Sequence, residues 1–482
     1  RAWRQGGALW PDLALVVAIA LVFAVRFYVV RSLDVPMWGD SYQHTMVAQL
    51  LVDNGGLFNS WEPYARMQSL TYHFGFQTAA AVVAWFASAF GAHDVPQAVL
   101  WTGQILNGLA VLALYPLGVR LGGNRWAGVA AVVVAGLLSP MPMFYVNWGR
   151  YTQLAGQTVL PAAVCLSWLA LESETGRRRW AIFLLASLAL GGLALTHYRV
   201  LILAVLFFAA LLLAEVRGVR FRPLLGGTAA LGVGGGLLFL PWFLHVYGGR
   251  ILQGFAARLS TPATQVSEWT QQYNAIGDLA TYLPLPLWIL LIIAMGWGLW
   301  RRNKPAAVVG IWWLLVLLAA NPQWLGLPGT GAINNFAVFI AAYIPAAVLL
   351  GGAAGWLAGD LQVHAGRWRP IAATLLVLGL SLWGARDRLA DLKVPTYALV
   401  TRPDLRAAAW VLQNTPAQAR FLVNSFFAYG DSSIVGSDGG WWLPLLAHRD
   451  STLPPLLYAS EAGPTPDYRE WVNALSRAIQ QK

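Results

Sequence analysis

The sequence predicts a polytopic α-helical membrane protein with a small soluble α/β domain at its C-terminal end. Of the 482 residues, 57% are hydrophobic and only 11% are charged, a balance typical of integral membrane proteins. Apolar runs of about 20 residues, each long enough to span the hydrocarbon layer of a bilayer, recur over positions 1–385. Residues 386–482 are more polar, and we expect them to fold as a separate domain.

Basic residues gather in short stretches between the apolar runs and mark the loops that face the cytoplasm. They account for the net charge of +11, so this charge indicates a membrane topology and argues against a nucleic-acid partner. The basic stretches are Arg1/Arg4, Arg120/Arg125, Arg177–Arg179, Arg217/Arg220/Arg222, Arg301/Arg302/Lys304 and Arg367/Arg369. The spans predicted after Arg120 are 126–143, 152–171, 180–196, 199–215, 224–247, 283–300, 306–320, 333–358 and 371–385.

Three apolar runs precede Arg120, namely 11–30, 72–92 and 97–120. Three crossings would place every later basic stretch outside the cytoplasm, against the tendency of basic loops to face it. We therefore expect 72–92 to lie at the membrane interface without crossing. The result is about eleven spans, a cytoplasmic N-terminus and an extracytoplasmic C-terminal domain. The first run shows no small-residue cleavage site and is expected to be a retained span and not a signal peptide.

The predicted domains are a membrane domain, 1–385, and an extracytoplasmic domain, 386–482. The outer side then receives two long loops, 31–96 and 248–282, together with short turns. The single cysteine, Cys165, lies in an apolar run, which excludes an intramolecular disulfide and a thiolate metal cluster.

The segment Trp38–His44 directly follows the first predicted span. Asp40 and His44 stand four residues apart, which places both on one face of a helix. A carboxylate where a membrane helix meets water is costly unless it has a partner or a function. Asp40 is therefore a candidate for acid–base chemistry, and the alternative is that it only caps a helix. Arg66 and His73 lie in the same outer loop.

Cationic residues occupy the next outer turns. Arg150 stands at a helix start, a suitable place for a phosphate oxygen, although it could instead reach lipid headgroups. His197 and Arg199 lie in a very tight turn between two spans. His197 alone is also consistent with a core histidine, whereas Arg199 has no acidic neighbour in sequence.

Two further segments hold candidate residues. The long loop 248–282 contains Glu268, its only glutamate, and loops of this length are usually functional or disordered. In the C-terminal domain, glycines surround Asp438 and precede Trp441 and Trp442, which predicts a tight turn close to a ligand or membrane. The tryptophan pair could alternatively anchor the domain on the bilayer surface.

These segments, in this order, resemble the GT-C superfamily of membrane glycosyltransferases, most closely the catalytic subunit of oligosaccharyltransferase. In that family acids also come from the second outer loop, whereas residues 147–157 here contain none, and the tryptophans here follow the aspartate. The resembling segments are Asp40–His44, Gly149–Gly156, Gln265–Glu268, Asp438–Trp442 and Leu446–Thr452.

The resemblance implies an inverting transfer of a sugar from a polyprenyl-phosphate or -diphosphate donor to an extracytoplasmic glycan, lipid or protein acceptor. Asp40 would be the base, with His44 and Glu268 as further catalytic residues and Asp40 as the candidate ligand of a divalent cation, Mg²⁺ or Mn²⁺. The expected donor-phosphate ligands are Arg150, His197 and Arg199. The expected acceptor or loop contacts are Arg66, His73, Asp438 and Trp441.

Two other classes of function remain as alternatives. The first is a non-catalytic assembly subunit of a membrane complex on the same scaffold. The second is a transporter, which the near absence of charge in the predicted spans disfavours, Arg26 being the main exception.

Overall fold

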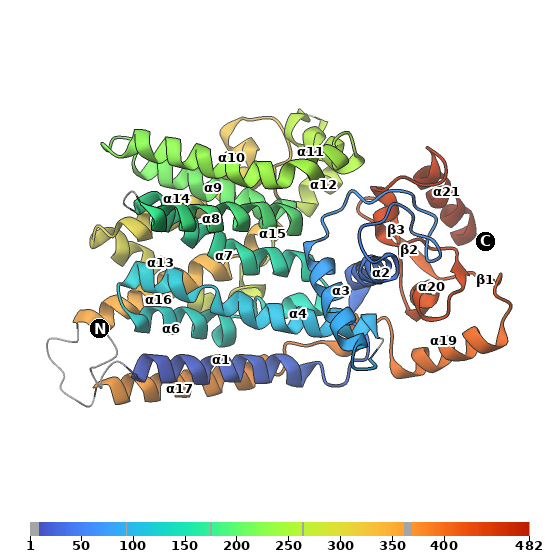
Figure 1. Cartoon of the computed structure of the whole chain (residues 1–482), viewed down its shortest axis with the longest axis horizontal. Coiled ribbons are helices and arrows are strands. Elements are labelled where there is room, and N and C mark those ends of the chain that lie inside the picture. Colours follow the sequence, from blue (N-terminus) through green and yellow to red (C-terminus); the bar gives the residue numbers. More distant parts are fainter. Residues whose placement is uncertain (1–8, 93, 174–175, 263–264, 361–368, 482) are drawn as a thin grey trace.

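The computed structural model describes residues 9–92, 94–173, 176–262, 265–360 and 369–481. A bundle of long helices carries a small mixed domain at one end, and α2 (Trp38–Asn54) and α3 (Gly75–Ser88) lie between the two (Figure 1). The C-terminal domain, drawn in orange and red, therefore covers the end of the bundle to which the first outer loop belongs. This arrangement places the polar loops of both parts together.

Every apolar run predicted to span the membrane contains a helix of the bundle, and among the described residues six helices are long and apolar enough to cross a membrane. The number of crossings and the side of each loop stay predictions. The bundle consists of α1 (Trp10–Val29), α4 (Val95–Leu112), α5 (Tyr115–Gly122), α6 (Arg125–Val133), η3 (Val134–Leu138), α7 (Tyr151–Glu172), α8 (Arg177–Thr196), α9 (Tyr198–Ala214), α10 (Phe221–Val246), α13 (Leu285–Trp300), α14 (Lys304–Ala320), α15 (Asn335–Ile340), α16 (Tyr343–Asp360) and α17 (Arg369–Arg388). Of the predicted basic stretches, Arg1/Arg4 and Arg367 lie outside the described residues.

The run 72–92 forms a helix only over α3, which has 14 residues. At 1.5 Å per residue it is about 21 Å long, whereas the hydrocarbon core is about 30 Å thick. That this run does not cross the membrane stays a prediction.

Arg26, the charged residue that stands out in the first span, joins three parts of the bundle. Its side chain is fully buried and donates hydrogen bonds to Asn107 Oδ1 at 2.7 Å, Gly136 O at 2.9 Å and Met143 Sδ at 2.9 Å. Gly136 lies in the π-helical turn η3, where the wider hydrogen-bond spacing leaves carbonyls available. The charge in this span is therefore structural.

The C-terminal domain is a mixed α/β unit with two small sheets, one parallel (β1–β4) and one antiparallel (β2–β3). The preceding helix α17 ends at Arg388, so the predicted boundary at 385/386 falls inside that helix. The elements that follow are α18 (Val394–Tyr397), α19 (Arg402–Asn414), β1 (Arg420–Phe421), β2 (Ser425–Ala428), β3 (Ser433–Gly436), η9 (Gly439–Trp442), α20 (Leu443–Leu446), β4 (Asp450–Ser451), η10 (Leu456–Ala459) and α21 (Tyr468–Gln480).

The tryptophan pair of this domain packs against α2. Trp441 and Trp442 are 1% and 0% exposed, and their rings lie 5.1 and 5.3 Å from that of Tyr42. A Cβ at Gly39 would lie 2.7 Å from the Trp441 ring, so only glycine allows this approach. Because both rings are buried, the alternative that they anchor the domain on the bilayer surface is wrong.

A buried carboxylate holds the two parts together at a second point. Glu461 is 0% exposed and accepts hydrogen bonds from Ser69 Oγ at 2.7 Å, from Thr71 N at 2.9 Å and from Tyr72 N at 3.0 Å. The loop that leads into α3 therefore depends on an acceptor from the C-terminal domain.

We expect Glu461→Ala to destabilise the protein by roughly 2–4 kcal/mol, because it leaves the buried N–H groups of Thr71 and Tyr72 without an acceptor. Thermal unfolding of the purified chain measures this change. The exposed Glu470 supplies the control, since Glu470→Ala removes a carboxylate that is not buried. Equal melting temperatures for the two variants would show that the Glu461 contacts contribute nothing.

Single-cysteine labelling in a background with Cys165→Ala tests the position of the run 72–92. We expect Asn59→Cys and Ala92→Cys, both at exposed positions, to react with a membrane-impermeant thiol reagent from the outside. Arg178→Cys should react only from the cytoplasmic side. Labelling of positions 59 and 92 from opposite sides would show that the run crosses.

Candidate functional site

A cleft of about 190 Å³ lies between the start of α2 and the β2–β3 sheet of the C-terminal domain. Asp40 lines it from the membrane domain, and Phe426, Tyr429, Ser437 and Trp441 line it from the opposite side. The lining is mostly aromatic and apolar around one carboxylate. Asp40 is therefore in position to meet a ligand that contacts both parts of the chain.

Asp40 is paired with Arg150 across two separate loops. Arg150 Nε lies 3.4 Å from Asp40 Oδ2, and the two side chains are 22% and 21% exposed. Gly149, at φ +60°, brings the loops together, because a Cβ there would lie 2.6 Å from both Met37 O and Ser41 Cβ. Trp38, at the first turn of α2, also has a positive φ of +68°, which is costly for a bulky residue and marks a constrained segment beside the cleft.

Burial raises the pKa of the Asp40 carboxyl above its usual value, although the charges of Arg150 and Arg199 act in the opposite direction. A carboxylate with a raised pKa is a stronger proton acceptor than an exposed aspartate, which suits it to general base chemistry.

Positive charge accumulates beside this pair. Arg199 makes no hydrogen bond or ion pair with the part of the chain that the structure describes, and the charges of Arg150 and Arg258 both act on it. Arg258 belongs to α11 (Arg250–Ser260), a helix of the long outer loop. Like charges in partly buried surroundings repel one another unless an anion lies between them, so this arrangement favours binding of an anion.

Two histidines, His73 and His197, form a buried layer behind the charges. The His73 ring lies 3.8 Å from that of Tyr72 and 4.5 Å from that of His197. His197 Nδ1 accepts a hydrogen bond from Val200 N at 3.3 Å and so caps α9. Burial lowers the pKa of both His73 and His197, which keeps them neutral.

His44 does not line the cleft, in contrast to the expectation from its spacing with Asp40. Its side chain is 2% exposed, and its Nδ1 lies 3.1 Å from Gln77 Nε2 of α3. His44 lies one helical turn after Asp40 on α2, where its side chain is below the surface and faces α3. We therefore do not retain it as a catalytic residue.

Other predicted residues have local partners. Arg66 pairs with Asp450 at 3.2 Å on the surface, away from the cleft. Asp438 accepts a hydrogen bond from Gly440 N at 2.9 Å and caps η9. The structure does not bring these two side chains to Asp40.

Glu268 is exposed at the start of α12 (Glu268–Tyr273). Its neighbour Trp269 packs on Gly430, because a Cβ at Gly430 would lie 2.9 Å from the indole ring. The long outer loop thus reaches the turn that carries Tyr429, next to the cleft.

The site contains two residues that the sequence analysis missed. The charges of Asp40 and Arg150 both act on the Tyr429 phenol, and burial raises its pKa above the usual range. Tyr429 precedes Gly430 and Asp431 in a turn with three consecutive positive φ angles, and the Tyr-Gly-Asp string alone did not mark it as part of a site. The second is Arg258, which the sequence analysis did not single out within the loop 248–282.

The residues at Asp40 do not fit a divalent cation. Over the described ranges, no group of three or more His, Cys, Asp or Glu side chains could hold a metal ion. The charge nearest to the Asp40 carboxylate is the guanidinium of Arg150. A hard cation needs several oxygen ligands of its own, and here a fixed positive charge is present instead.

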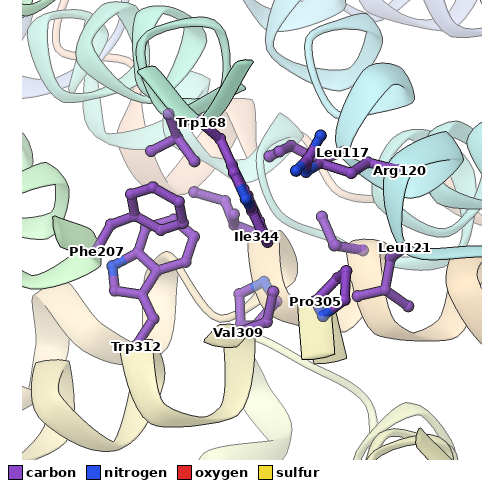
Figure 2. Close-up of a pocket in the computed structure, with 12 residues that line it drawn as sticks. Leu117, Arg120, Leu121, Trp168, Phe207, Pro305, Val309, Trp312 and Ile344 are labelled. Carbon is purple, nitrogen blue, oxygen red and sulfur yellow. The ribbon is translucent and has the colours of Figure 1, made fainter. Parts of the chain in front are cut away.

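A second pocket lies inside the bundle among α5, α7, α9, α14 and α16 (Figure 2). Its lining is apolar except for Arg120, which is paired with Glu172 and lies 4.1 Å from the Trp168 ring. Trp168 lies about 27 Å from the Arg150 end of α7, at 1.5 Å per residue. This pocket is therefore separate from the Asp40 cleft.

No protein-family model and no curated protein sequence matches this chain. Among solved structures it is similar to the oligosaccharyltransferase AglB from Archaeoglobus fulgidus in complex with an inhibitory peptide and a dolichol-phosphate, with a TM-score of 0.66 and 13% identity over 97% of this chain and 68% of that chain. The A. fulgidus enzyme in complex with Zn and sulfate gives 0.60 and 14%, covering 96% and 66%. ArnT from Cupriavidus metallidurans bound to undecaprenyl phosphate gives 0.59 and 15%, covering 92% and 87%. The chain therefore has the GT-C fold, as its resemblance to oligosaccharyltransferase predicted.

His44 makes the stability of this site depend on pH. Burial lowers its pKa from 6.5 to about 3, so the unfolded chain binds a proton that the folded chain does not. Its contribution is fully present above pH 6.5 and is lost as the pH falls toward 3, at a slope of up to about 1.4 kcal/mol per pH unit. We expect His44→Gln to flatten the fall in melting temperature between about pH 7 and about pH 4. His448→Asn, at an exposed position, is the control, and an unchanged slope in His44→Gln would contradict the assignment.

Proposed function

We propose that this protein is a glycosyltransferase of the cell membrane that uses a polyprenyl-phosphate or -diphosphate sugar, with Asp40 as the base. The observation that carries the proposal is the placement of Asp40 in a cleft beside Arg150, with Arg199 nearby and without a partner among the described residues. A carboxylate and two separate cations next to one cleft supply the groups that the reaction needs.

The reaction would proceed by direct displacement. The acceptor hydroxyl or amine transfers its proton to Asp40 and attacks the anomeric carbon of the donor sugar, which inverts the configuration there. The bond from that carbon to the phosphate oxygen breaks, and its electron pair stays on the phosphate. Arg150 and Arg199 would stabilise the negative charge that develops on this leaving group.

The fold supports a lipid-linked donor. AglB was solved with a dolichol-phosphate and ArnT with undecaprenyl phosphate, which are both polyisoprenyl phosphates. The apolar helices around the loop 248–282 would hold the isoprenoid chain of such a donor here. His197 and His73 would form a neutral wall behind the phosphate, and α12 with Glu268 would cover it.

The acceptor, which we propose to be a glycan, lipid or protein outside the cytoplasm, would enter between α2 and the C-terminal domain. Trp441 and the partly exposed side chains of Trp38 and Tyr429 would contact it. Arg66 and Asp438 are occupied by their own partners, and we do not assign them to the acceptor. An assembly subunit without catalysis is the second candidate function, and the transfer measurement described next distinguishes it from an enzyme.

We expect Asp40→Asn to reduce sugar transfer by at least about a thousandfold, because the amide cannot accept the acceptor proton. Arg199→Ala should instead weaken binding of undecaprenyl phosphate at least about tenfold, since a charge-assisted contact is lost. Sugar transfer from polyprenyl-phosphate donors and a direct binding measurement test the two effects. Arg402→Ala, which removes a surface partner of Asp34, is the matched control. Full transfer by Asp40→Asn would exclude Asp40 as the base, and the absence of transfer by the unsubstituted protein would favour the assembly subunit.

A further inference from the structure

We propose that Arg150 takes the place of a divalent cation beside the Asp40 carboxylate, so that the donor phosphate is bound by guanidinium groups without a metal ion. This inference rests on the proposed function, because it concerns the donor phosphate of the same site. If it is correct, the site does not need the divalent cation that the resemblance to oligosaccharyltransferase implied.

The guanidinium of Arg150 lies close to where a metal ion would bind the Asp40 carboxylate. Arg150 Nε lies 3.4 Å from Asp40 Oδ2, on the side of the carboxylate that faces the second outer turn. A divalent cation would bind that carboxylate at about 2.1 Å and so would lie within a few ångströms of the guanidinium. Arg199 and Arg258 add two more positive charges nearby, so a metal ion would enter a site that already repels it.

The histidines near Asp40 are the side chains that could complete a metal site. His197 Nδ1 already accepts the Val200 N–H, and His44 Nδ1 is within hydrogen-bonding distance of Gln77 Nε2. His73 is packed between two rings, Tyr72 and His197, and neither of its nitrogens has a hydrogen-bond partner in the described part of the chain. These nitrogens still do not complete a metal site, because no group of three or more His, Cys, Asp or Glu side chains among the described residues could hold a metal ion. The histidines therefore build the wall of the site and do not converge on Asp40.

Arg150 is held rigidly enough to act as a fixed cation. Its guanidinium carbon lies 4.8 Å from the Phe336 ring centroid and 5.9 Å from that of Trp148. Stacking of this kind orients the planar group, and a guanidinium has five N–H donors. Nε can face Asp40 while the terminal nitrogens remain for a phosphate oxygen, a bridging role comparable to that of a metal ion.

The test combines metal binding with donor binding in the full chain. We expect a Mn²⁺ titration followed by electron paramagnetic resonance to show no site that depends on Asp40. Binding of undecaprenyl phosphate should change less than about twofold between excess EDTA and added Mg²⁺ or Mn²⁺, whereas Arg150→Ala should weaken it at least about tenfold. Arg150→Lys should retain part of the affinity, because it keeps the charge but not the fork of N–H donors. Arg402→Ala and the melting temperatures of all variants control for folding.

A Mn²⁺ ion that binds once per chain and is lost in Asp40→Asn would overturn the inference. Loss of undecaprenyl phosphate binding in EDTA with recovery in Mn²⁺ would also overturn it. If the protein binds no undecaprenyl phosphate under any condition, the proposed function fails, and the Mn²⁺ titration alone still decides whether Asp40 holds a metal ion.

Discussion

The ion pair between Asp40 and Arg150 is the interaction on which the arrangement of the site depends. Each side chain is mostly buried, and a charge in such a place needs a partner close by. The partners come from two outer loops that meet only because Gly149 has no side chain to hold them apart. The same contact fixes the start of α2 and therefore the direction in which Asp40 enters the cleft.

The cleft itself is completed by the C-terminal domain. Gly39 allows the Trp441 ring to rest directly on the backbone next to Asp40, and Glu461 secures the loop that carries Tyr72 and His73. The contact of Trp441 with Gly39 forms a wall of the cleft. The hydrogen bonds of Glu461 hold the loop whose His73 lies behind the arginines. The C-terminal domain thus contributes to the geometry of a site whose charged groups belong to the membrane domain.

The sequence allowed the helical segments, the mixed C-terminal domain and several site residues to be predicted, because hydrophobic periodicity and loop charge are local signals. Asp40, Arg150 and Trp441 each stand out in their own segment. Their mutual positions could not be predicted, because the ion pair and the packing on Gly39 join residues far apart in the chain. The prediction for His44 failed for the same reason. Helical spacing placed His44 near Asp40, but the sequence could not show that α3 covers it. Tyr429 and Glu461 gave no local signal, and only the packing of the two domains reveals them.

The packing of Trp441 and Trp442 on Tyr42 has a consequence for biogenesis. The ribosome makes α2 long before its aromatic partners, which lie far along the chain. Until those residues have been synthesised, the face of α2 that carries Tyr42 lacks the two rings that cover it in the folded protein. Assembly of the site must therefore follow synthesis of the segment that holds Trp441 and Trp442.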